Sequence, residues 1–235
     1  MSDFQRLRRA ATVMALFTAV LWLLLGYGAL LPFDAIRAFG LFPRDIGRLH
    51  GILTAPLIHS SIGHLAANSV PLFVLGTAML YGLPRATRIA LPAIWLVSGL
   101  GVWLFGRASF HVGISGVTHG MVFFVLLVGI LRRDRASIAL VMFVSFLYGG
   151  MIWGVLPQRP DISFESHLAG ALAGLVAAYA LRDADPLTGP RLLQPLPPPA
   201  ADEDDPLIGD QWREGTEPTA PRPDDGSERG PAGDR

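Results

Sequence analysis

The sequence contains no cysteine and no lysine, and only 16% of its 235 residues are charged. Without cysteine, disulfides and thiolate metal sites are excluded. A soluble domain of this length usually has charge on about a quarter of its residues, whereas here 51% of the residues are hydrophobic. The basic residues, all arginine, form no stripe with interleaved aromatic side chains, so no nucleic-acid partner is expected. The composition therefore predicts an integral membrane protein.

The apolar residues are grouped into six segments, each close to the length of a membrane span. A spanning helix needs about 20 residues, within a range of about 17–25, and lipid offers no partner for unpaired backbone groups. We therefore predict an all-α membrane protein, a bundle of six transmembrane helices. The predicted spans are Ala10–Leu31, Ile62–Leu83, Ile89–Phe105, Val112–Leu131, Ala136–Leu156 and Phe164–Leu181. The third and sixth are short, which favours positions surrounded by protein or in a thinned bilayer.

The arginines indicate how the spans are oriented. Within residues 1–182, five arginines are spread through the longer or more mixed loops of one side, namely Arg37, Arg44, Arg48, Arg107 and Arg159. The other nine stand before the first span, after the second and fourth spans, and after the sixth. With six spans these ends lie on one side, which the excess of positive charge identifies as the cytoplasm. Residues 1–9 are then a cytoplasmic N-terminus, and residues 10–182 a membrane domain with a long outer loop at 32–61. Residues 183–235, rich in proline, hold 13 acidic residues against 5 arginines and predict a disordered cytoplasmic tail.

Ser115 stands at the outer start of the fourth span, between Gly113 and Gly116. Glycine on both sides leaves the serine accessible, and the free N–H groups of a first helical turn favour negative charge. A nucleophilic serine with an anion site beside it needs such a place. Taken alone, however, this tetrapeptide more often reflects small-residue packing between membrane helices.

His167 opens the sixth span, and Gly170 and Gly174 follow it on the same helix face. The fourth span has a glycine pair of the same spacing, beginning directly after Ser115, and such surfaces permit close helix contact. Both spans start on the outer side. Contact between the two glycine faces would therefore bring the imidazole of His167 to the hydroxyl of Ser115, although a lone histidine in a membrane is more often a structural hydrogen-bonding residue.

His64 and Asn68 are four residues apart and share one face at the outer end of the second span. Their side-chain donors fit an oxyanion hole, and they equally fit polar capping of the helix together with Ser60 and Ser61. A zinc site is disfavoured, because His59 and His64 would point about 140° apart on a helix and the second and fourth spans hold no carboxylate. Neither a metal nor a cofactor is expected.

His119 lies one turn after Ser115 on the same helix face. Side chains in a helix point back toward its N-terminus. The ring of His119 is therefore expected to pack against His167 rather than to serve as the base.

Together these residues resemble the rhomboid family of intramembrane serine proteases. The family's His-x4-His-x3-Asn occurs at His59–Asn68, its Gly-x-Ser-Gly at Gly113–Gly116, and its His-x2-Gly-x3-Gly at His167–Gly174. The six spans and the long first outer loop fit as well. The resemblance covers about residues 8–182 and leaves the tail outside.

The resemblance implies that Ser115 is the nucleophile and His167 the general base. It further implies that His64, Asn68 and the Ser115 amide bind the oxyanion. The partners would be single-span membrane proteins in membrane lipid, cut in or near the outer half of the bilayer. The expected location is the inner (plasma) membrane of a bacterial cell. No acidic third member is expected, because a carboxylate buried in lipid is costly.

Two positions depart from the family pattern. His50-Gly51 stands where the family often has Trp-Arg in the first outer loop, so the loop's anchoring is expected to differ. His119 stands where the family usually has tyrosine. It can still stack on His167, and it adds a group that titrates near neutrality.

Three other functions fit parts of the pattern. A catalytically silent pseudoprotease would bind membrane clients without cutting them, but the intact Ser115/His167 pair argues against it. A transporter with a histidine proton relay would need the relay to continue to the cytoplasmic side, and none of the six histidines lies there. A zinc protease would be inhibited by chelators.

Overall fold

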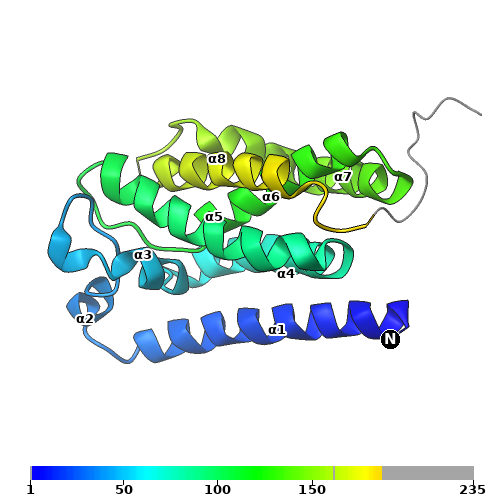
Figure 1. The fold of residues 1–235 in the computed structure, drawn as a ribbon. Helices are drawn as coiled ribbons and strands as arrows, with labels where there is room; N and C mark the ends of the chain where they lie inside the picture. The colour runs from blue at the N-terminus through cyan, green and yellow to red at the C-terminus, as the bar shows by residue number, and fades with distance from the viewer. Residues whose placement is uncertain (1, 161, 187–235) are drawn as a thin grey trace, which may run out of the picture. The chain divides into compact units, whose positions relative to one another are not determined.

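The computed structural model describes residues 2–160 and 162–186, and this part of the chain is a helical bundle (Figure 1). Six of its helices are long and apolar enough to cross a membrane, which confirms the predicted all-α membrane fold. They are α1 (Asp3–Gly28), α4 (Ile62–Gly82), α5 (Pro84–Phe105), α6 (Ser115–Arg132), α7 (Arg135–Tyr148), which η3 (Gly149–Val155) continues, and α8 (Phe164–Leu181). The connection from α1 to α4 holds four short elements, α2 (Phe33–Arg37), η1 (Ile46–Arg48), α3 (Gly51–Thr54) and η2 (Ala55–Leu57). Of the predicted tail, residues 187–235 lie outside the described residues.

Two spanning helices begin earlier than the hydropathy pattern predicts. α1 begins at Asp3 instead of Ala10, because Ser2 and Gln5 form a capping box at its start. α5 begins at Pro84 instead of Ile89, and proline suits a first helical turn, where its missing N–H costs nothing. The prediction that the third span is short was therefore wrong, since α5 has 22 residues.

The fourth span also differs from the prediction at its start, and the fifth at its end. Residues 112–114 belong to a connection, so α6 begins at Ser115 itself. α7 ends at Tyr148, and the remainder of the predicted fifth span is the 3₁₀ segment that starts at Gly149. Two consecutive glycines there disfavour continuation of the α-helix. The sixth span has the predicted bounds.

α6 is the most buried of the spanning helices and packs most extensively against α8. α5 contacts both of these helices, while α1 joins the bundle through α4, where Met14 occupies the space that Gly76 leaves open. α1 and α7 leave most of their apolar surface exposed. Exposed apolar faces on spanning helices are suited to contact with lipid.

Arg132 joins the helix ends at the side of the bundle opposite to Ser115. Its guanidinium donates to the carbonyl oxygens of Arg182, Asp185 and Pro186, beyond the end of α8. It also lies 3.4 Å from the carboxylate of Asp134, the N-cap residue of α7. Both ionised side chains are almost completely buried, so the network links α6, α7 and the segment after α8.

We expect Arg132→Met to lower the free energy of unfolding by about 3 kcal/mol, because it removes the buried guanidinium that lies 3.4 Å from the Asp134 carboxylate and donates to three carbonyl oxygens. The neighbouring Arg133 is exposed, so Arg133→Met is the matched control and should change stability by less than about 0.5 kcal/mol. Thermal and denaturant unfolding in detergent micelles measure the difference. Equal stability of the two variants would contradict the network's role.

Candidate active site

The connection that leads into Ser115 depends on the glycine at position 113. Gly113, two residues earlier, has a φ of +105°, a backbone conformation that side chains disfavour. A Cβ on Gly113 would also lie 2.6 Å from Cε1 of His64, so the imidazole of His64 packs directly on this backbone. The chain then enters α6 with Ser115 as its first residue, where the helix N-terminus offers free N–H groups.

His167, in the first turn of α8, faces Ser115. Its Nε2 lies 2.9 Å from Oγ of Ser115, and its Nδ1 lies 2.9 Å from the carbonyl oxygen of Gly154. A carbonyl oxygen can only accept, so Nδ1 carries the proton and donates it to Gly154. The lone pair of neutral His167 is then on Nε2 and accepts from the serine hydroxyl, which is the tautomer that a general base needs.

The contact between α6 and α8 sets this distance. A Cβ on Gly170 would overlap the carbonyl oxygen of Gly116, and one on Gly174 would overlap that of Gly120. The two glycine faces therefore meet backbone to backbone, as in other small-residue helix pairs. In this register Ser115, one residue before Gly116, lies level with His167.

His119 contacts both members of the pair. Its ring is stacked on that of His167, with the ring centroids 3.8 Å apart and the planes 9° from parallel. Its Nδ1 lies 2.7 Å from the carbonyl oxygen of Ser115 in the preceding turn. These contacts hold the ring beside the imidazole of His167 instead of in line with the hydroxyl.

His64 and Asn68 lie in the first two turns of α4, and their side chains have different partners. Nδ1 of His64 lies 3.1 Å from Oγ of Ser60, and the Ser61 hydroxyl caps the helix by accepting from the His64 N–H. The amide of Asn68 donates to the carbonyl oxygen of His64, which uses one of its two N–H groups. The structure thus brings His64 against the serine connection, while Asn68 is bonded within its own helix.

His59 holds the backbone next to the serine, a role that sequence reasoning missed. It precedes α4, so the helical spacing considered for His59 and His64 does not apply, and their rings meet edge to face. Nε2 of His59 accepts from the N–H of Ile114 at 3.3 Å. Burial, aided by the charge of His64, lowers the pKa of His59 to about 4, so the ring stays neutral and able to accept.

His50 and Gly51 stand where the family often has Trp-Arg, and here the connection from α1 to α4 is held by contacts within itself. Nε2 of His50 lies 2.8 Å from the carbonyl oxygen of Ala38, and the Thr54 hydroxyl donates to that of Phe39. Gly51 packs against Leu41, where a Cβ would lie 2.6 Å from Cα of Leu41. Among the described residues, no three histidine, aspartate or glutamate side chains converge as metal ligands would.

Comparison with known proteins relates this arrangement to one family. A family model described as the Rhomboid domain matches residues 47–184. An uncharacterised protein of Mycobacterium tuberculosis is 41% identical over 155 residues, which cover 60% of this chain and 63% of that protein. The mitochondrial RHOMBOID-like protein 12 of Arabidopsis thaliana is 25% identical over 166 residues, 58% of this chain and 47% of that protein. The chain thus spans less than two thirds of the length of these relatives.

Proposed function

We propose, from the premise that this chain belongs to the rhomboid family, that it is an intramembrane serine endopeptidase acting through Ser115 and His167. The observation that carries the proposal is the 2.9 Å contact from Nε2 of His167 to Oγ of Ser115, with Nδ1 bonded to Gly154. This combination supplies both the nucleophile and a base in the correct tautomer. The substrates are single-span membrane proteins, cut in or near the outer half of the bilayer.

The reaction starts when Oγ of Ser115 attacks the scissile carbonyl carbon and its proton passes to Nε2 of His167. The tetrahedral intermediate then collapses as the imidazolium gives that proton to the leaving amine, and the C–N bond breaks. A water molecule attacks the acyl-enzyme, with His167 taking its proton. His167 returns this proton to Oγ when the ester bond breaks, which restores the enzyme.

Gly154 does the orienting work that an aspartate does in a catalytic triad. Its carbonyl oxygen accepts from Nδ1 of His167 in both the neutral and the protonated ring, so the ring keeps its orientation throughout the cycle. A neutral carbonyl also avoids the cost of a carboxylate in the membrane. The stacked ring of His119 supports the same orientation from one face.

The oxyanion is stabilised at the start of α6. The Ser115 N–H points out of the first helical turn, where the helix dipole favours negative charge. The imidazole of His64 lies against the connection that leads to this turn, and the second N–H group of Asn68 completes the donor set. Donors held in place before the reaction contribute most to the stabilisation of the developing charge.

The distribution of arginines supports an orientation with the site on the outer side of the membrane. Arg6 and Arg132 lie near the ends of α1 and α6 that are remote from Ser115. By the positive-inside rule both termini are then cytoplasmic, and the membrane is the plasma membrane of a bacterial cell.

Activity-based labelling in membranes tests this function. We expect a fluorophosphonate probe to label the protein, and peptide mapping by mass spectrometry to locate the adduct on Ser115. The nearby Ser98 and Ser166, which hydrogen-bond to each other, serve as internal controls and should stay unmodified. A single-span reporter protein should be cleaved, with no effect of chelators. Binding of the reporter without cleavage or labelling would indicate a pseudoprotease instead.

A further inference from the structure

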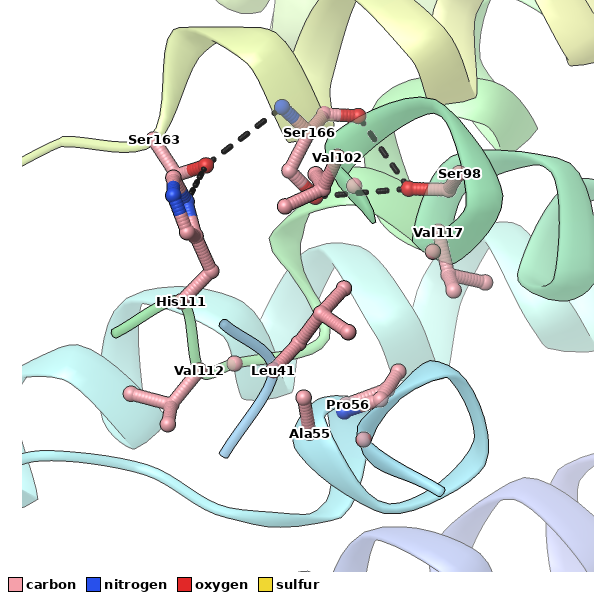
Figure 2. A pocket seen from close by; sticks show the side chains of 14 residues that line it. Leu41, Ala55, Pro56, Ser98, Val102, His111, Val112, Val117, Ser163 and Ser166 are labelled. Carbon is pink, nitrogen blue, oxygen red and sulfur yellow. Dashed lines mark hydrogen bonds between the residues drawn. The ribbon is translucent and has the colours of Figure 1, made fainter. Parts of the chain in front are cut away.

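A second pair of side chains links the two chain segments that carry Ser115 and His167. His111 stands four residues before Ser115, in the connection from α5 to α6. Ser163 stands four residues before His167 and is the N-cap residue of α8. Nδ1 of His111 lies 2.6 Å from Oγ of Ser163, and Figure 2 shows the two side chains meeting across the segments.

The hydrogen-bond partners of His111 determine which of its two ring nitrogens carries the proton. Its Nε2 lies 3.1 Å from the carbonyl oxygen of Arg107, so Nε2 carries the proton and Nδ1 accepts. The Ser163 hydroxyl therefore donates to Nδ1, while its oxygen accepts from the N–H of Ser166. Burial lowers the pKa of His111, although the Arg107 carbonyl and the charge of Glu165 oppose the shift, so the neutral form prevails.

The backbone on both sides of this pair is bonded as well. His111 and Leu41 exchange two backbone hydrogen bonds of 2.9 and 3.0 Å, which tie the first outer loop to the serine connection. On the other side, the carbonyl oxygen of Ser163 accepts from the N–H of His167. A shift of Ser163 would thus be passed to His167, and a shift of His111 would move the chain four residues before Ser115.

Other contacts hold the fold without this pair. Arg107 and Glu165 form an ion pair of 3.4 Å between the same two segments. Deeper in the bundle, the contact of Gly116 with Gly170 sets the separation of α6 and α8. The bond between His111 and Ser163 adds a further link between the two segments, at the residues that stand four positions before Ser115 and His167.

We propose that His111, through Ser163, is a positioning residue that keeps Oγ of Ser115 within reach of Nε2 of His167. The proposal rests on the proposed serine-protease function. Its physical basis is that reacting groups displaced by about 1 Å can lose about a hundredfold in rate.

Two isosteric variants test the role, because each keeps one half of the imidazole. Asparagine places an oxygen near the position of Nδ1 and can still accept from Ser163, whereas glutamine reaches only toward the position of Nε2. We expect His111→Gln to lower kcat for the single-span reporter by about 10–100-fold with little change in KM, and His111→Asn to restore most of it. His50→Gln is the matched control, because it makes the same substitution at a histidine that is exposed in a loop.

A double-mutant cycle with Ser163→Ala separates the bond from the loss of the helix cap. Ser163→Ala should lower kcat in the wild-type background and have a much smaller effect in His111→Gln. Unfolding midpoints of the His111 variants should stay close to the wild type, because the glycine contact and the ion pair remain, while Ser163→Ala should lower the midpoint equally in both backgrounds through the lost cap. Wild-type kcat in His111→Gln, or independent effects in the cycle, would overturn the positioning role alone. Absence of cleavage and labelling in the wild type would overturn the proposed function, and the positioning role with it.

Discussion

Ser115→Ala and His167→Ala are each expected to lower the rate of reporter cleavage by about 10⁴-fold or more, and the double variant to lose no more than either single one. The two side chains act as one unit, because the hydroxyl is a useful nucleophile only when Nε2 takes its proton. Groups that act as a unit show such strongly non-additive losses. Single-turnover rates with the purified protein in lipid bilayers measure the effect.

The design distinguishes lost chemistry from lost structure. The Ser115 hydroxyl has His167 as its partner, so its removal leaves the helix contacts intact, and the unfolding midpoint of Ser115→Ala should match the wild type. His50→Ala is the control for removal of a histidine outside the site, since His50 bonds only to the first outer loop. Losses that multiply in the double variant would mean that the two residues act independently, contrary to the proposed dyad.

The six spans could be predicted because lipid imposes a length and a composition on every helix that crosses it. The predicted helix bounds are wrong at the helix ends, where lipid no longer constrains the sequence. Near the helix ends that lie away from Ser115, arginines such as Arg6 and Arg85 lower the local hydropathy, yet they continue the helix because their long side chains can reach water. The cap at Ser2 and the proline at the first position of α5 decide where these helices begin, and hydropathy registers neither.

The site could be predicted where its geometry follows from helix periodicity. Gly170 and Gly174 share a face with His167. The sequence therefore indicates both a close contact between the fourth and sixth spans and the meeting of His167 with Ser115. The Gly154 carbonyl could not be found in this way, because every residue has a carbonyl and only the tertiary fold selects one. His111 gave one signal, a polar residue just before the apolar run of α6, but its partner Ser163 lies 52 residues away.

Gly170→Ala is expected to be the most damaging single-methyl change in the bundle. The added Cβ would overlap the carbonyl oxygen of Gly116, which is backbone and cannot move aside as a flexible side chain would. α6 and α8 must then separate, and overpacking of this kind costs about 3 kcal/mol. Because the same contact brings His167 to Ser115, cleavage should fall by at least about a hundredfold in the protein that remains folded.

Gly26→Ala is the matched control, because it adds the same methyl group within α1 at a position with no atom within 4 Å of the new Cβ. Alanine is the better helix former by about 1 kcal/mol, so this variant should be as stable as the wild type or slightly more stable, and fully active. Unfolding in detergent micelles and single-turnover cleavage should be measured on both variants. A Gly170→Ala protein that unfolds and cleaves like Gly26→Ala would show that the two helices have room between them, and the glycine contact would then not be what sets the distance from His167 to Ser115.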